Sequence, residues 1–247
     1  MSSLISIRND LNLSLKDKNF RDMIGRNIFI CIVLAAAGIA TSCSRKAEPE
    51  KLKTGDLVFV GLPLDYSIEE GSMDEAISSA TGDSGELNLI HVAIAEVKGD
   101  STWIIDATIK HGVDRHPLDT FLTDFTLKDG SLPVFIVKRL NDPSKAEQFV
   151  ENAKRSLGQP YDVYFLPDNG SKYCSELVRD SYTLDDGAYI FDSVPMNFKG
   201  PDGEFPLYWK QLFGLLGQEI PQDVPGTNPQ DMSKSPAIHT IDVKLTR

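Results

Sequence analysis

The sequence predicts an α+β domain in which an antiparallel sheet packs on a few helices. One observation is a pair of apolar segments, 89–97 and 102–108, that are separated by a short polar turn, as in a β-hairpin. The other is that segments with helical spacing and helix caps are interspersed with strands in mixed order. The 247 residues, 41% of them hydrophobic, suffice for one domain or at most two.

The first half of the domain is expected to begin with a strand. Residues 55–60 (GDLVFV) form a short apolar run behind a turn residue. Ser72 is then placed to cap a helix over 72–81, because acidic residues occupy its first turn. After the hairpin, 134–140 (VFIVKRL) is a third clear strand.

The second half is expected to be richer in helices. A helix over 142–157 has an Asn/Asp cap, Pro143 in its first turn, and Gly158 at its end. Another helix begins at Cys174 and continues over 175–184. Residues 185–247 are rich in Pro and Gly, so we interpret them as an extension that wraps the same domain, with one helix at 207–216.

The charge balance is acidic and excludes one class of partner. Lys and Arg number 25 against 36 Asp and Glu, a net charge of −11. This is the wrong sign for a surface that neutralises phosphates, so no nucleic-acid partner is expected.

The N-terminus carries an apolar run over 27–40, behind Arg21 and Arg26. The run is short for a membrane span and has the basic flank of an export signal. Because it ends in small residues and Cys43, it resembles the bacterial lipoprotein signal, in which that cysteine becomes the acylated first residue. We therefore expect a protein of the bacterial cell envelope that is lipid-anchored through Cys43 and faces the periplasm or the exterior.

These features divide the chain into four segments. Residues 1–43 are the expected signal, with Met23 as a possible true start, and 44–53 are a polar tether. Residues 54–184 form the expected catalytic domain, and 185–247 the extension. The alternative for the apolar run is a buried helix.

Only one cysteine remains in the exported domain, since Cys31 lies in the apolar run and Cys43 would be lipidated. No disulfide and no cysteine-rich metal site are therefore expected. Cys174 stands where a loop passes into a helix, and the free N–H groups there favour thiolate over thiol. The alternative is a buried structural cysteine.

A thiolate nucleophile needs a base and a group that orients the base. Of the four histidines, His91 is the best base because it lies on a strand. His111 and His116 lie in a turn-rich segment where solvated or loop-bonding roles are expected, and His239 is near the C-terminus. Asp106 lies across the hairpin in an otherwise apolar strand, where it either pairs with His91 or faces solvent.

Two motifs resemble a known family. Residues 158–161 (GQPY) and 174–178 (CSELV) look like the G-x-P-Y and C-S-x-L-V motifs of NlpC-type papain-like cysteine peptidases. His91 precedes Cys174 here, an order that resembles the circularly permuted branch, the YiiX/YaeF-like family, which is distantly similar to lecithin:retinol acyltransferase. The resemblance covers about 54–184.

This resemblance implies a permuted papain-like fold with Cys174 as nucleophile, His91 as general base and Asp106 as the third residue. It also implies that Tyr161 lies close to the nucleophile and binds substrate or supports the oxyanion. The N–H of Cys174 is the expected oxyanion donor. Glu176 either lines the cleft, bonds Tyr161, or is a solvated acid of the helix start.

Three functions are compatible with these residues. The first is a thiol hydrolase that cleaves an amide bond, with a cell-wall peptide as the expected substrate. The second uses the same site to hydrolyse or transfer fatty acyl groups of a lipid-like substrate, and the third is a binding lipoprotein without catalysis. The aromatic segment 191–209 either shapes the cleft or caps the core. No metal or organic cofactor is implied.

Overall fold

The structure, a computed structural model, describes residues 50–63, 66–82 and 87–246, which belong to one compact unit. The export signal and its anchor, Met23 and Cys43 included, lie outside the described residues. Among the residues described, no helix combines the length and the apolar character needed to cross a membrane.

The centre of the described domain is a six-stranded sheet in which every neighbouring pair is antiparallel. Its strands stand in the order β4-β3-β2-β1-β5-β8. They are β1 (Leu57–Leu62), β2 (Asn88–Lys98), β3 (Ser101–Thr108), β4 (Gly112–Pro117), β5 (Val134–Leu140) and β8 (Ile238–Ile241). A separate small ribbon pairs β6 (Val194–Pro195) with β7 (Pro225–Gly226).

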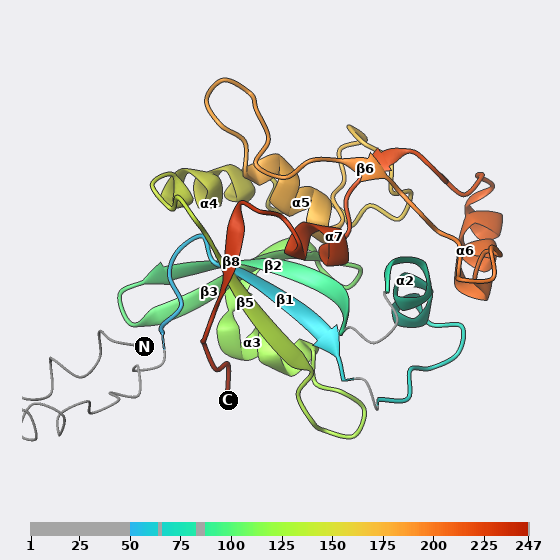
Figure 1. Ribbon diagram of the computed structural model, residues 1–247, viewed down its shortest axis with the longest axis horizontal. Helices are drawn as coiled ribbons and strands as arrows, with labels where there is room; N and C mark the ends of the chain where they lie inside the picture. Colours follow the sequence, from blue (N-terminus) through green and yellow to red (C-terminus); the bar gives the residue numbers. More distant parts are fainter. Residues whose placement is uncertain (1–49, 64–65, 83–86, 247) are drawn as a thin grey trace, which may run out of the picture. The chain divides into compact units, whose positions relative to one another are not determined.

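Helices cover both faces of this sheet. They are α2 (Met73–Thr81), α3 (Leu118–Asp124), α4 (Ala146–Lys154), α5 (Cys174–Ser181), α6 (Leu207–Leu216) and α7 (Pro229–Ser233). Because side chains alternate along a strand, Leu57 and Phe59 of β1 pack with the apolar residues of α4 and α5, whereas Val58 and Val60 pack with Phe121 of α3. Figure 1 shows α4 and α5 on one side of the sheet and α3 on the other. The predicted α+β class is confirmed.

The prediction of a helix over 142–157 is wrong at both ends, because α4 spans only Ala146–Lys154. Asp142 accepts a hydrogen bond from the N–H of Ser144 in a turn that precedes the helix. Lys145 occupies the cap position without a side-chain cap bond. The residues after α4 form turns up to Gly158, whose φ of +84° suits glycine.

The region around His116 is also different from its prediction. It forms β4, which pairs with β3, and α3 follows directly. His116 is buried rather than solvated. In the extension, the predicted helix is present as α6, but the extension also supplies α7 and β8, an edge strand of the central sheet.

Candidate active site

A bulge in β2 sets the position of His91. Val60 pairs with His91, but the next residue, Gly61, pairs with Leu89, so Ile90 is an extra residue on β2. Such bulges bend a strand and redirect its side chains, and they are common beside active sites. The imidazole of His91 packs against the ring of Phe125, with 4.7 Å between ring centroids.

Asp106 meets His91 where β2 and β3 separate. The pairing of these strands runs from the hairpin turn to Ile94 and Ile105 and stops there, which leaves room between them. Nε2 of His91 lies 2.8 Å from Oδ2 of Asp106, and the carboxylate is buried. With Nε2–H donated to Asp106, Nδ1 is left for a second partner.

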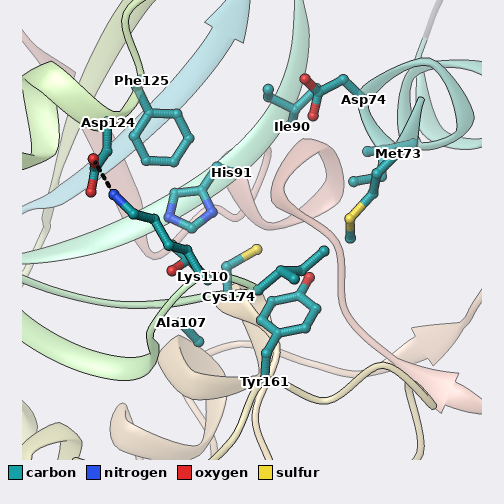
Figure 2. Close-up of a pocket in the computed structure, with 13 residues that line it drawn as sticks. Met73, Asp74, Ile90, His91, Ala107, Lys110, Asp124, Phe125, Tyr161 and Cys174 are labelled. Carbon is teal, nitrogen blue, oxygen red and sulfur yellow. Dashed lines mark hydrogen bonds and ion pairs between the residues drawn. The ribbon is translucent and has the colours of Figure 1, made fainter.

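Cys174 comes to the same place from α5. It is the first residue of this helix, and its preceding cap residue, Tyr173, offers no side-chain cap bond to the first turn. The thiol lies in a pocket of about 330 Å³ that His91 and Tyr161 also line. Figure 2 shows the sulfur pointing to the space between the His91 imidazole and the Tyr161 ring.

The charge state of His91 reflects its two neighbours. Burial alone would lower its pKa, but the interaction with Cys174 and the hydrogen bond with Asp106 outweigh burial and raise the pKa to about 10. An imidazole held in its protonated form beside a cysteine is the electrostatic partner that a thiolate needs.

Tyr161 is positioned by its attachment to β4. The N–H of Gly158 donates to the carbonyl of Val113, and the N–H of Val113 donates to the carbonyl of Gln159. The tyrosine ring thus lies beside the thiol (Figure 2). Burial, and then the charge of Cys174, raises the pKa of Tyr161 well above its ordinary value, so its hydroxyl keeps its proton as a hydrogen-bond donor.

The structure does not bring Glu176 into this pocket. Oε1 of Glu176 lies 3.2 Å from Nζ of Lys172, and Glu176 lines neither of the two pockets that contain Cys174. Burial raises its pKa to about 7, against the opposing effect of Lys172. Asp162 does not line these pockets either. Its carboxylate instead accepts hydrogen bonds from the backbone N–H groups of Tyr164 and Leu166.

Sequence reasoning missed a second histidine at the site. Nε2 of His116 lies 3.8 Å from Oδ1 of Asp106, the oxygen that His91 does not use. The buried ring of His116 stacks with Phe121. The strand that places His116 in the interior was not predicted, because His116 has polar neighbours and is followed by a proline.

Charged side chains at the rim of the pocket were also missed. Lys110 lies 2.9 Å from Oδ1 of Asp124, as the dashed line in Figure 2 marks. Asp74, from the first turn of α2, lines the same pocket, and burial raises its pKa. Lys110 lies in the turn after β3, Asp124 in α3 and Asp74 in α2, so no local pattern connects them.

A second, smaller pocket adjoins Cys174 and Tyr161. Its volume is about 50 Å³, and the C-terminal extension supplies much of its lining. Phe198 and Trp209 line it and are also members of a buried cluster. The aromatic segment 191–209 therefore takes part in both of its predicted roles, lining a pocket and covering the core.

The fold and this pocket define a papain-like cysteine hydrolase in permuted order. A family described as "permuted papain-like amidase enzyme, YaeF/YiiX, C92 family" matches residues 51–242, and the chain belongs to it. Its members are cysteine peptidases or amidases, which confirms the prediction of a cysteine hydrolase with papain-like amide chemistry.

Two proteins are similar to this chain over most of its length. The chain is 24% identical over 192 residues to the uncharacterized protein YiiX of Escherichia coli strain K12, covering 76% of this chain and 85% of the relative. A crystal structure of YiiX from Escherichia coli O157:H7, titled a metalloprotein, has a TM-score of 0.60 at 22% identity and covers 80% of this chain and 100% of its own. In the described part of this chain, no group of three His, Cys, Asp or Glu side chains is arranged to hold a metal ion.

Proposed function

We propose that this protein hydrolyses an amide bond with Cys174 as nucleophile, His91 as acid and base, and Asp106 as the residue that orients His91. The observation that carries the proposal is the shared pocket of Cys174 and His91, together with the 2.8 Å contact from His91 to the buried carboxylate of Asp106. Each group has the neighbour that its role requires.

The first half of the reaction forms an acyl-enzyme. The thiolate of Cys174 attacks the carbonyl carbon, and a C–S bond forms while the carbonyl oxygen becomes an oxyanion. The N–H of Cys174 at the start of α5 and the hydroxyl of Tyr161 are the donors for that oxyanion. Protonated His91 then gives its proton to the nitrogen, the C–N bond breaks, and the amine leaves.

The second half releases the acid. Neutral His91 takes a proton from a water molecule as that water attacks the thioester carbonyl, and the C–S bond breaks. The carboxylic acid leaves, and the thiolate of Cys174 and the protonated imidazole are restored. Asp106 holds the ring in one orientation through both halves.

We also propose that the protein acts at the bacterial cell envelope, tethered by a lipid on Cys43, and that its substrate is a cell-wall peptide. Support comes from the apolar run before Cys43 and the polar tether after it. In bacteria that express the full chain, the protein should partition into the detergent phase. Cys43→Ala should move it to the aqueous phase, and equal partitioning would reject the anchor.

The proposed reaction is tested on a cell-envelope extract with residues 44–247, compared with the same protein carrying Cys174→Ala. Mass spectrometry should find muropeptides shortened at an amide bond only with the intact thiol. If the two treatments give the same products while both proteins unfold at the same temperature, hydrolysis is rejected and a binding role is favoured.

A fatty-acyl reaction at the same thiol is the second candidate. The observation in its favour is the mostly apolar lining of the small pocket beside Cys174. In the same extract, loss or transfer of acyl groups from lipids, again only with the intact thiol, would identify this reaction in place of amide cleavage.

A further inference from the structure

The small pocket beside Cys174 has a lining of two kinds. Most of it is apolar, with Ile90, Phe165 and Met196 among its side chains. Its volume of about 50 Å³ is well below the roughly 300 Å³ or more of pockets that hold whole drug-sized ligands. It therefore has room for a group of only a few heavy atoms.

The polar side chains that line this pocket include Trp209 and Thr227. Trp209 and Thr227 are 2% and 4% exposed. Nε1 of Trp209 and Oγ1 of Thr227 have no hydrogen-bond partner within the described residues. The indole N–H can only donate, and the hydroxyl can donate as well, so an acceptor atom suits each of them. Buried groups of this type nearly always have a partner.

Thr227 is held firmly in this position. Its backbone N–H donates to the hydroxyl of Tyr173 at 3.0 Å, and its carbonyl accepts from the hydroxyl of Ser175 at 3.1 Å. These two residues flank Cys174 in the sequence. The C-terminal extension is thereby attached on both sides of the nucleophile, and the Thr227 side chain is fixed relative to the thiol.

The position of His91 indicates which part of a substrate lies in the small pocket. His91 lines the larger pocket but not the smaller one. Since His91 must protonate the leaving amine, the amine side of the substrate belongs in the larger pocket. The acyl side then extends from the thiol toward Trp209 and Thr227.

We propose that the small pocket is an acyl-side subsite for a short group that is apolar but carries a hydrogen-bond acceptor, such as the carbonyl of an N-acylated amino acid. The inference rests on the proposed function and narrows its substrate to peptides. A plain aliphatic chain would cover the two donors and leave them without a partner. The loss of hydrogen bonds of this kind lowers the rate roughly five- to tenfold.

The test compares two substrates of equal acyl length, p-nitrophenyl N-acetylglycinate and p-nitrophenyl pentanoate. The preference is the ratio of their kcat/KM values. Thr227→Val keeps the side-chain shape and both backbone bonds but removes the hydroxyl, so the preference for the acetylglycinate should fall about five- to tenfold. Comparing the ratio between variants cancels the unequal intrinsic reactivity of the two esters.

Two controls accompany this variant. Thr227→Ser retains the hydroxyl and should keep the wild-type ratio, as should Thr240→Val, which makes the same chemical change on the exposed side of the edge strand β8. Trp209→Phe removes the other donor and should lower the ratio independently. An unchanged ratio in both Thr227→Val and Trp209→Phe overturns the subsite.

Failure of the proposed function gives a different result. In that case neither ester is hydrolysed faster by the wild type than by Cys174→Ala, and the subsite is rejected together with the reaction. Thiol-dependent hydrolysis with an unaltered ratio rejects the subsite alone.

Discussion

At the scale of single residues, Asp106 gives the sharpest test of the proposed triad. Asp106→Asn keeps the shape but removes the negative charge that fixes the ring of His91. We expect kcat to fall by roughly two to four orders of magnitude, with KM little changed, because orientation is lost while the base remains. Steady-state kinetics checks this, with the exposed Asp119→Asn as the matched control. A wild-type kcat would remove Asp106 from the mechanism.

Glu176 makes a prediction about stability instead of activity. Burial raises its pKa from 4.5 to about 7, so between these values the folded state binds more protons than the unfolded state. Stability from this group is therefore fully present at low pH and is lost as pH rises through about 7. The uncharged side chain of Glu176→Gln should not lose stability in this way. The melting temperature of this variant, relative to that of the wild type, should therefore increase as the pH rises from about 5 to about 8.

Thermal unfolding across that pH range measures the effect of Glu176→Gln. The exposed Glu147→Gln on α4 is the control and should follow the wild-type profile. A difference from wild type that stays constant with pH would show that the Glu176 carboxyl does not titrate in this window.

At the scale of elements, helices and strands with a strong local sequence pattern were predicted correctly, and those with a weak pattern were missed. The hairpin of β2 and β3 was predicted from its apolar runs, and α2 from its cap, since the side chain of Ser72 accepts the N–H of Glu75. The edge strands β4 and β8 were missed. Each is short, and half of its residues are polar, so period-two alternation is too brief to stand out.

Side-chain hydrogen bonds from Arg139 attach the start of the described domain to the sheet. Arg139 of β5 forms two hydrogen bonds with the carboxylate of Asp56, at 2.7 and 2.8 Å, and a third with Glu50 at 2.8 Å. Asp56 is almost fully buried. Arg139→Met leaves that carboxylate without its cation, which should lower the free energy of unfolding by roughly 3 kcal/mol.

Urea unfolding measures the effect of Arg139→Met. The comparison is Lys128→Met, which breaks an ion pair with Glu69 in which both side chains are exposed, and which should leave the unfolding midpoint unchanged. Equal midpoints for the two variants would show that the Arg139 contacts contribute nothing to stability.

At the scale of the whole molecule, the candidate site was predictable only where its residues carry their own signal. Cys174, His91 and Asp106 each stood out on one element by residue type and placement. Trp209 stood out only as part of the aromatic segment 191–209 and Thr227 did not stand out, because both come to the pocket beside the thiol only through the path of the extension around the domain. Contacts of this kind are set by tertiary packing, which a local pattern does not encode.

The extension should therefore be part of the folding unit. Phe191, Met232 and Ile238 belong to the cluster that packs on α4 and α5, and β8 completes the edge of the sheet beside β5. Without 185–247 these contacts are lost and apolar surface is exposed. We expect residues 50–184 to bind a hydrophobic dye and to unfold without a cooperative transition, as compact states without fixed packing do.

Residues 50–242 are the matched control for that truncation, because they lose only the segment after β8 and should unfold cooperatively in urea, as the full domain does. A single cooperative transition for residues 50–184 would contradict this argument. It would mean that the β1–β5 sheet and its helices are stable alone, and that the extension serves the thiol pocket without contributing to the fold.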